Sequence, residues 1–421
     1  MLETIKTLHA ECIDRLSALD DAIERETTCI EMPNKISVIL GMRRVGKTYF
    51  MLHKIKQLLA DGVPTTSILY VDFEDDRLLP LNQEKLATIL DDFYSLFPEN
   101  HQRTCYLFLD EVQTIEGWAL VIRRFHNTKN IRFYLSGSSA KLLSKEIATE
   151  LRGRAISTEL FPFNFNEYLK TKKLQAPALP LSKKMEDVYT KQLLAYIEEG
   201  GFPGVVGYPR IQQTMVLQDY IDVVLFRDII ERYKITNVSV IKYMIHYLLG
   251  NFSTKLSINK LFNDLKSQGF SVGRSSVYDY LSYIEDAYLI FTVPIYAESI
   301  RKIQNNPKKI YTIDNGMVHA NTLSRLKNYG RALENLVYLD LRRRGDVVYY
   351  YITQEGYEVD FLTKRLSGEL ALYQVCFDPA DELTFARETR ALAAAEKELG
   401  IKAEPITMKN YIKGASSSAI A

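Results

Sequence analysis

Apolar runs of strand length alternate with helix-compatible stretches along the first 160 residues. The first thirty residues carry apolar side chains at helical spacing, which predicts an amphipathic helix over residues 1–30 that packs on the body or on a partner. Beyond it, five apolar runs predict strands: residues 36–40, Ser67–Phe73, Cys105–Leu109, Ile131–Leu135 and Ala155–Leu160. This alternation predicts a doubly wound α/β domain over residues 31–169, with parallel strands and ligands at their carboxyl ends.

The hydrophobic pattern changes after residue 169. The stretch Lys170–Lys184 is rich in Lys, Pro and Leu, which is typical of a linker or an exposed loop. Four further regions follow: a mainly helical region over 185–250, a helix-turn-helix-strand unit similar to a winged helix over 251–320, a small α+β domain over 328–412 and a disordered tail over 413–421.

Composition narrows the class of protein. A chain of 421 residues with 47% hydrophobic content can form two or three domains, and a net charge of +1 gives no general attraction to nucleic acid or to a membrane. The four cysteines lie far apart, which indicates buried thiols in a reducing compartment and argues against a zinc site. Without a signal-peptide pattern or a long apolar segment, we expect a cytoplasmic protein that does not associate with membranes.

The first predicted strand runs directly into a phosphate-binding loop. Residues 41–48 match the pattern G-x-x-x-x-G-K-T, in which glycines let backbone N–H groups surround a triphosphate. Lys47 is expected to reach the β- and γ-phosphates, and the Thr48 hydroxyl is expected to hold Mg²⁺. The predicted nucleotide contacts are Gly41, Met42, Arg43, Arg44, Val45, Gly46, Lys47, Thr48 and Tyr49.

Two carboxylates follow the buried run at residues 105–109. Asp110 is expected to hold the Mg²⁺ that bridges the phosphates, and Glu111 is expected to polarise the attacking water. Ser136, at the end of another strand, is a candidate to sense the γ-phosphate or to orient the water, although Ser and Gly at a strand end more often form a simple turn. Arg152 and Arg154 are candidates to stabilise the γ-phosphate in cis or from a neighbouring subunit, with ordinary surface arginines as the alternative.

The order of these motifs resembles the AAA-type ATPases of prokaryotes that are allied to the STAND group. The series is Gly41–Thr48, Phe73-Glu-Asp-Asp, Leu109-Asp-Glu-Val-Gln, Ser136-Gly-Ser-Ser, Leu151-Arg-Gly-Arg and Pro162-Phe-Asn-Phe-Asn-Glu-Tyr-Leu. The resemblance covers nearly the whole chain and implies ATP and Mg²⁺ as cofactors. It also implies that Pro203, in Gly201-Phe-Pro203, contacts the base, whereas a helix-breaking turn is the competing explanation.

The C-terminal region resembles PD-(D/E)xK nucleases, in which two carboxylates and a lysine surround Mg²⁺. Glu334 and Asp360 match two acidic positions, but Gln374 stands where the second strand carboxylate belongs and Cys376 stands where the lysine belongs. A neutral amide is a poor ligand for a hard cation, and a buried thiol carries no positive charge. The pattern therefore predicts a nuclease-like fold whose chemistry is lost.

The sequence as a whole favours a slow Mg²⁺-dependent ATPase that acts as a conformational switch on an unknown protein partner. The alternative is an ATP-controlled DNA-binding regulator or nuclease, although the helix Arg274–Ala287 carries three acids against a single arginine. A third class is a nucleotide-loaded interaction protein that barely hydrolyses ATP. Assembly into a homo-oligomer stays open.

Overall fold

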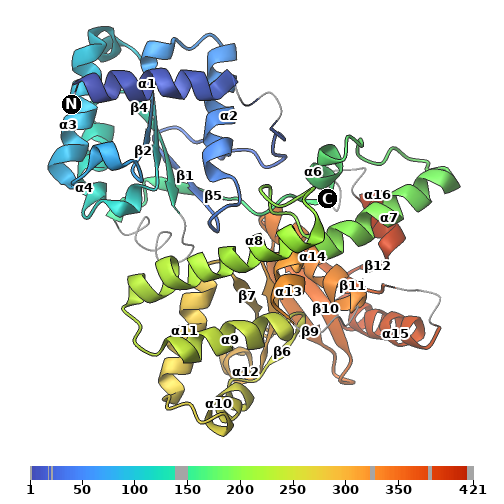
Figure 1. Ribbon diagram of the computed structural model, residues 1–421. Helices are drawn as coiled ribbons and strands as arrows, with labels where there is room; N and C mark the ends of the chain where they lie inside the picture. The colour runs from blue at the N-terminus through green and yellow to red at the C-terminus, as the bar shows by residue number, and fades with distance from the viewer. Residues whose placement is uncertain are drawn as a thin grey trace. The chain divides into compact units, whose positions relative to one another are not determined.

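A computed structural model describes residues 2–17, 19, 22–137, 150–322, 328–377 and 382–414. Ser138 and Ser139 of the predicted Ser136-Gly-Ser-Ser motif lie outside the described residues, as do residues 415–421 of the predicted tail. The chain divides into two compact units, unit 1 (residues 1–160) and unit 2 (residues 161–421), which Figure 1 shows with their elements labelled.

Unit 1 is built on a five-stranded parallel sheet. In the order β2-β3-β4-β1-β5, every neighbouring pair of strands is parallel. The strands are β1 (Ile36–Leu40), β2 (Ile68–Asp72), β3 (Cys105–Asp110), β4 (Ile131–Gly137) and β5 (Ala155–Glu159). The predicted doubly wound α/β fold is therefore confirmed.

Helices surround this sheet (Figure 1). The α-helices of unit 1 are α1 (Leu2–Ser17), α2 (Lys47–Ala60), α3 (Gln83–Leu96) and α4 (Trp118–Thr128). Short 3₁₀ turns cover Thr65–Ser67, Asp76–Leu78, Pro98–Gln102 and Val112–Thr114. All five residues of β1 are buried, and the rings of Phe108 and Tyr134 stack with centroids 4.4 Å apart between neighbouring strands, so the centre of the unit is dry.

The N-terminal helix is shorter than the sequence predicted. It ends at Ser17, and the described residues from 22 to 35 contain no helix. After Ser17 the backbone N–H groups of Leu19 and Ala22 donate to the carbonyl oxygens three residues earlier, those of Leu16 and Leu19, so the chain continues in turns although the apolar spacing goes on. The buried side chains of α1 are Ile5, Leu8, Cys12 and Leu16, which form the predicted apolar stripe.

Unit 2 begins with helices and continues into a small antiparallel sheet. The helices are α6 (Phe165–Thr171), α7 (Lys183–Glu199), α8 (Arg210–Val223), a π-helix (Val224–Glu231) and α9 (Val238–Gly250). The three-stranded sheet has the order β6-β8-β7, from β6 (Thr254–Leu256), β7 (Ile290–Val293) and β8 (Lys308–Thr312). Its helices are α10 (Ile258–Ser267), α11 (Arg274–Asp286), α12 (Ile300–Asn305) and α13 (Asn315–Asn321).

The remainder of unit 2 is the expected small α+β region. Its elements are α14 (Tyr329–Arg343), β9 (Val347–Ile352), β10 (Glu358–Lys364), β11 (Leu370–Val375), α15 (Glu382–Leu399), β12 (Ala403–Ile406) and α16 (Met408–Gly414). The sheet order is β12-β11-β10-β9, and α15 packs on it through Ala391, Leu392 and Ala395. Lys413 and Gly414, which the sequence assigned to the disordered tail, belong to α16 because Tyr411 and Ile412 are buried and anchor that helix.

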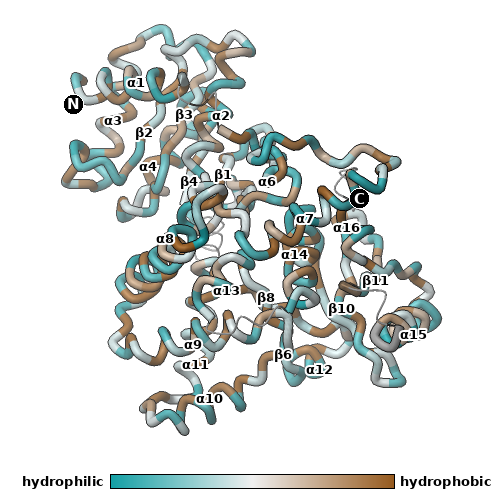
Figure 2. The backbone as a smooth tube through the Cα atoms, turned by 45° about the vertical axis from the view of Figure 1, so that its right-hand side comes forward, coloured by the Kyte–Doolittle hydropathy of each residue, from teal (hydrophilic) through white to brown (hydrophobic). Residues whose placement is uncertain are grey.

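Hydropathy along the helices agrees with this packing. Figure 2 shows hydrophobic and hydrophilic residues interspersed along α8 and α15, and α15 packs on the sheet through Ala391, Leu392 and Ala395. Within the described part of the chain, no helix is both long and apolar enough to cross a membrane.

A buried aspartate connects two parts of unit 2. The Asp314 carboxylate accepts hydrogen bonds from the backbone N–H groups of Gly201, at 2.7 Å, and Met317, at 3.3 Å. Burial raises the pKa of Asp314 to about 6, against the opposing effect of these N–H donors. At this junction a Cβ on Gly316 would lie 2.3 Å from the Glu199 carbonyl oxygen, so the end of α7 and the start of α13 touch directly.

We predict that Gly316→Ala destabilises unit 2 by about 1–3 kcal/mol, because the added methyl group cannot fit against a backbone carbonyl. Thermal unfolding of the full chain measures the effect. Gly250→Ala is the matched control, since an added Cβ at the exposed end of α9 meets nothing within 4 Å. The control should be neutral or slightly more stable. Equal melting temperatures for the two variants would show that the junction is loosely packed.

Candidate nucleotide site

The phosphate-binding loop folds tightly between β1 and α2. A Cβ on Gly41 would lie 2.3 Å from the Leu160 carbonyl oxygen, so only glycine fits where β1 ends beside β5. Gly46 has a φ of 98°, in the left-handed region that glycine adopts without strain, and it directly precedes the first residue of α2. The local backbone structure therefore requires glycine at both positions of the predicted motif.

The amino end of α2 is open to an anion. No side chain caps its first turn, which also carries no acidic residue. The N–H groups of a first helical turn have no partner within the helix, and the helix dipole adds partial positive charge there. A phosphate group would satisfy both features.

Lys47 lies at the centre of the loop, 5% exposed. Its Nζ atom donates to the carbonyl oxygens of Gly41, at 3.2 Å, and Met42, at 3.3 Å, and it lies 3.5 Å from Glu111 Oε1. Burial pushes the pKa of Glu111 upward, but Lys47, Gln113 and Arg43 outweigh burial and leave that pKa below its ordinary value. Glu111 is therefore a carboxylate, paired with the lysine of the loop.

Asp110 is the most connected side chain of the site. Its Oδ2 atom accepts from the Thr48 hydroxyl, at 2.6 Å, and from the Tyr70 hydroxyl, at 2.9 Å. Its Oδ1 atom accepts from the Ser136 hydroxyl. The strand order explains this convergence, because β4 lies between β1 and β3 and brings Ser136 between the loop and Asp110.

The backbone at Glu111 is strained. Its φ of 54° is unusual for a residue with a side chain, and its N–H donates to Ser136 Oγ, at 3.0 Å. The Gln113 side-chain amide donates to Glu111 Oε2, while Gln113 Oε1 is buried without a hydrogen-bond partner. Strain of this kind persists only where surrounding contacts hold it, and it is common at functional sites.

Sequence reasoning missed three residues of this site. Tyr70 was part of an apolar run, Gln113 was part of a motif without an assigned role, and Arg25 lay in the predicted N-terminal helix. Arg25 Nη1 donates to the carbonyl oxygen of Val45, at 2.9 Å, and so holds the loop from outside. The sequence shows that each of these three side chains has a polar group. It does not show which residue that group contacts, so their roles could not be predicted.

The other predicted loop contacts differ in exposure. Met42 and Val45 are fully buried, so only their backbone groups can meet a ligand, whereas Arg44 and Tyr49 are exposed. Arg43 pairs with Glu74 at 3.0 Å, which ties the loop to the end of β2. The first six predicted residues form the loop before α2, and the last three open that helix.

The donor set at Thr48 and Asp110 fits Mg²⁺. Mg²⁺ prefers oxygen ligands and is usually bound through one or two protein oxygens, with waters and phosphates completing the shell. A hydroxyl and a carboxylate 2.6 Å apart at the open end of the loop match this chemistry. Nowhere in the described ranges do three or more His, Cys, Asp or Glu residues form a group suited to a metal ion, so an all-protein cage is not offered.

Arg152 and Arg154 lie at the amino ends of the strands, on the side of the sheet opposite the phosphate-binding loop. They directly precede β5, whose first residue pairs with Ile36 at the amino end of β1, whereas the loop follows the carboxyl end. Five strand residues span roughly 16 Å at about 3.3 Å each. The structure therefore does not bring these arginines to the loop of their own chain, and action on the loop of a neighbouring subunit stays a prediction.

Pro203 belongs to unit 2, in the turn that follows α7. The Gly200 φ of 79° ends that helix, and a Cβ on Gly201 would lie 2.3 Å from the Phe163 carbonyl oxygen. Both glycines are therefore needed for backbone geometry and close packing. This agrees with the competing explanation, in which the motif is a helix-breaking turn. The predicted contact between Pro203 and the base stays a prediction.

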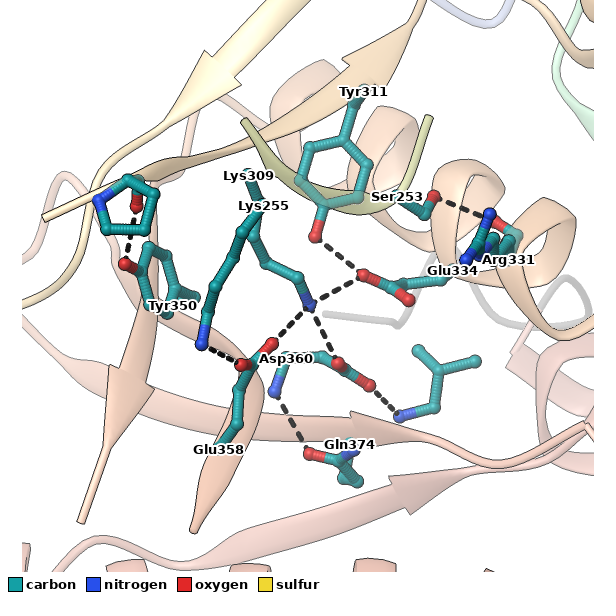
Figure 3. Close-up of polar contacts among 12 residues, drawn as sticks. Ser253, Lys255, Lys309, Tyr311, Arg331, Glu334, Tyr350, Glu358, Asp360 and Gln374 are labelled. Carbon is teal, nitrogen blue, oxygen red and sulfur yellow. Dashed lines mark hydrogen bonds and ion pairs between the residues drawn. The ribbon is translucent and has the colours of Figure 1, made fainter. Parts of the chain in front are cut away.

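The predicted nuclease-like residues also converge (Figure 3). Glu334 extends from α14 and Asp360 from β10, and the Lys309 ammonium of β8 lies between them. Gln374 Oε1 accepts the Asp360 backbone N–H, at 3.0 Å, and Cys376 is buried. Lys309 had not been predicted, because its position on a different sheet was not visible in the sequence.

Comparison with known proteins separates the two parts of the chain. Residues 33–169 match the model of an AAA domain, and residues 190–328 match a domain of unknown function. Neither model covers the C-terminal sheet, and the nuclease resemblance is not confirmed.

Solved structures with detectable similarity to this chain include the Walker-type ATPase of Pyrococcus abyssi, at 13% identity and a TM-score of 0.45, covering 74% of this chain and 94% of that one. Another is the Aeropyrum pernix ORC1 protein in complex with DNA, at 13% identity and a TM-score of 0.29, covering 76% of this chain and 93% of that one.

Whole-chain relatives are found in archaea and bacteria. A Haemophilus influenzae protein is 28% identical over 82% of this chain and 82% of its own length. The protein MJ1544 of Methanocaldococcus jannaschii is 38% identical over 386 residues, which are 90% of this chain and 82% of that protein. Identity at this level along nearly the whole length shows common descent, and the chain belongs to the family of MJ1544, with an AAA domain in its N-terminal part.

Proposed function

We propose that unit 1 binds ATP with Mg²⁺ and hydrolyses it slowly, and that unit 2 transmits the change to a protein partner. One observation carries the proposal. Lys47, Thr48, Asp110, Glu111 and Ser136 come from three segments, the start of α2, the end of β3 and β4, and they meet at the carboxyl ends of the parallel strands. Ligands of doubly wound sheets bind at these ends.

The Lys47–Glu111 contact supports hydrolysis rather than binding alone. At 3.5 Å and with two weak carbonyl partners, the lysine is loosely held and can turn to a triphosphate, whose charge is greater than that of one carboxylate. Glu111 then loses its cation and gains capacity to accept a proton from water. Phosphate binding would thus release the catalytic carboxylate.

The neighbouring groups have roles that follow from their contacts. Ser136 links Asp110 to the Glu111 backbone and would hold both carboxylates in register. Mg²⁺ at Thr48 and Asp110 would neutralise charge on the phosphates. Gln113, with a free buried oxygen beside Glu111, is placed to orient the same water.

Two further parts of the proposal concern the nucleotide base and the partner. ATP is favoured over GTP by the family resemblance, with Pro203 as the proposed contact to the purine. Nucleic acid stays a second partner class, because α10 and α11 with the β6-β8-β7 sheet have the element order of the predicted winged helix. Two acids of α11 form hydrogen bonds within unit 2: Asp286 accepts one from the Tyr233 hydroxyl, and Glu285 accepts one from the Thr292 hydroxyl.

We expect Lys47→Ala to abolish ATP binding and Glu111→Gln to keep binding while losing turnover by on the order of 10²- to 10⁴-fold. The first side chain holds phosphate, whereas the second acts only on water. Calorimetry measures binding, and phosphate release measures turnover.

Matched controls are Lys56→Ala, an exposed lysine on the same helix, and Glu116→Gln, an exposed glutamate after the same strand. Both should behave like the unmodified protein. Equal hydrolysis by Glu111→Gln and by the unmodified protein would refute the assignment of Glu111.

We predict that Arg152 or Arg154 acts on the γ-phosphate of a neighbouring subunit. Alanine at the active position should lower turnover by on the order of 10³-fold with little loss of ATP affinity. Specific activity should rise steeply with protein concentration, and mixing the arginine variant with Lys47→Ala should restore part of the rate.

Arg132→Ala provides the control, because Arg132 is an exposed arginine at the same edge of the sheet. If Arg152→Ala and Arg154→Ala both stay within a few-fold of this control, the two arginines are ordinary surface residues.

The C-terminal region is expected not to cut nucleic acid. Gln374 supplies no charge to a cation, and Cys376 is no substitute for the lysine that stabilises developing charge. Incubation with Mg²⁺ or Mn²⁺, ATP and single-stranded, double-stranded and branched DNA and RNA tests this directly. Cleavage that disappears in Asp360→Ala would contradict this prediction and make nuclease activity the favoured function of the C-terminal region.

A further inference from the structure

Three carboxylates surround one buried ammonium group in unit 2. Lys309 Nζ lies 2.8 Å from Glu334 Oε1, 2.9 Å from Asp360 Oδ1 and 3.1 Å from Glu358 Oε1. Lys309 is 3% exposed, so water takes little part in these contacts. We call Lys309, Glu334, Glu358 and Asp360 the lysine-centred cluster (Figure 3).

The hydrogen-bonding capacity of the lysine is fully used. An ammonium group has three N–H donors; that of Lys309 donates to Glu334 Oε1 and Asp360 Oδ1 and forms an ion pair with Glu358 Oε1, so each donor has a carboxylate partner. None is left to position a water molecule, so Lys309 cannot replace the missing catalytic lysine at position 376. Its role is that of a bound cation.

The carboxylate oxygens are also committed. Glu334 Oε1 accepts a second hydrogen bond from the Tyr311 hydroxyl, at 2.8 Å, and Asp360 Oδ2 accepts the Val375 N–H, at 3.0 Å. Gln374 Nε2 donates to Glu388, which leaves its amide oriented by two partners. The nuclease resemblance implies Mg²⁺ here, but the residues present do not fit it, because a lysine lies where the cation belongs.

Electrostatics favour the lysine over an empty site. Burial alone would lower the pKa of Lys309, but Asp360 and Glu334 reverse this and hold that pKa well above its ordinary value. Burial also raises the pKa of Glu334 to about 7, reinforced by Asp360 and opposed by Lys309. Lys255 adds a second positive charge at Glu358. Three acids are therefore matched against two lysines, and removing Lys309 would leave buried negative charge uncompensated.

We propose that the Lys309 ammonium takes the place of a divalent cation in this cluster, making it a permanent ion-pair joint instead of a metal-dependent active site. Lys309 and Tyr311 belong to β8, whereas their acidic partners belong to α14 and β10. The cluster therefore fastens the three-stranded sheet to the C-terminal sheet without any ligand. This inference rests on the proposed lack of nuclease activity in the C-terminal region. It adds a physical cause for that lack, namely a lysine in the position of the metal ion.

Binding of Mn²⁺ to the nucleotide-free full chain tests the proposal. The free Mn²⁺ signal in electron paramagnetic resonance is titrated in an Asp110→Asn background, which removes the carboxylate of the nucleotide site. The background protein should show no Mn²⁺ binding that depends on Asp360. Lys309→Met in the same background should create an Asp360-dependent Mn²⁺ site and raise the Mn²⁺ affinity of the protein at least about tenfold over that of the background protein, because the three carboxylates lose their cation.

Three comparison variants isolate the effect. Lys309→Met combined with Asp360→Asn should lose the new site, and Lys309→Arg should not form one because the positive charge stays. Lys255→Met removes a lysine from the edge of the same cluster, where its side chain is 35% exposed, and it should create no site. Lys309→Met should also melt at a lower temperature than Lys255→Met, with partial recovery in Mn²⁺.

Two results would overturn the proposal. One is Mn²⁺ binding by the background protein that Asp360→Asn abolishes, since the metal would then displace the lysine. The other is a folded Lys309→Met protein without a new Mn²⁺ site. If Lys309→Met does not fold, the comparison between the background protein and its Asp360→Asn variant decides alone. The titration reads binding and the nuclease assay reads cleavage, so failure of either inference is recognised separately.

Discussion

The order of strands in the parallel sheet is the constraint on which the nucleotide site depends. Because β4 lies between β1 and β3, the loop, Ser136 and the Asp110–Glu111 pair all emerge at the same edge. One side chain, Asp110, joins three strands and a helix through hydroxyl donors from Thr48, Tyr70 and Ser136. The same strand direction sends Arg152 and Arg154 to the other edge, so one topological fact both assembles the site and removes two residues from it.

Two buried lysines illustrate how similar chemistry serves different ends. Lys309 has three carboxylate partners within 3.1 Å, which match its three donors and hold the ammonium group in place. Lys47 has one carboxylate at 3.5 Å and two carbonyl groups at 3.2 and 3.3 Å, which compensate its charge poorly. The first arrangement is a fixed joint, whereas the second is poised to exchange its partners for phosphate. The numbers of carboxylates and their distances make the difference.

Local patterns predicted what is local in this chain. The five strands, the loop from Gly41 to Thr48 and the acids at the end of β3 follow from apolar runs and spacing, because each depends on neighbours in sequence. Contacts across long separations were not predictable. Tyr70 meets Asp110 forty residues away, and Lys309 meets Asp360 fifty-one residues away on another sheet. The N-terminal helix was predicted too long, because the apolar spacing continues beyond Ser17 although the helix ends there.

The central claim is that triphosphate binding draws Lys47 away from Glu111 and frees that carboxylate for water. The most direct test is the structure of the full chain with Mg²⁺ and a non-hydrolysable ATP analogue. The account predicts Lys47 in contact with phosphate oxygens, Mg²⁺ between Thr48 and Asp110, and Glu111 facing the γ-phosphate without its lysine. A bound nucleotide that leaves the Lys47–Glu111 pair intact, or that lies away from the amino end of α2, would contradict it.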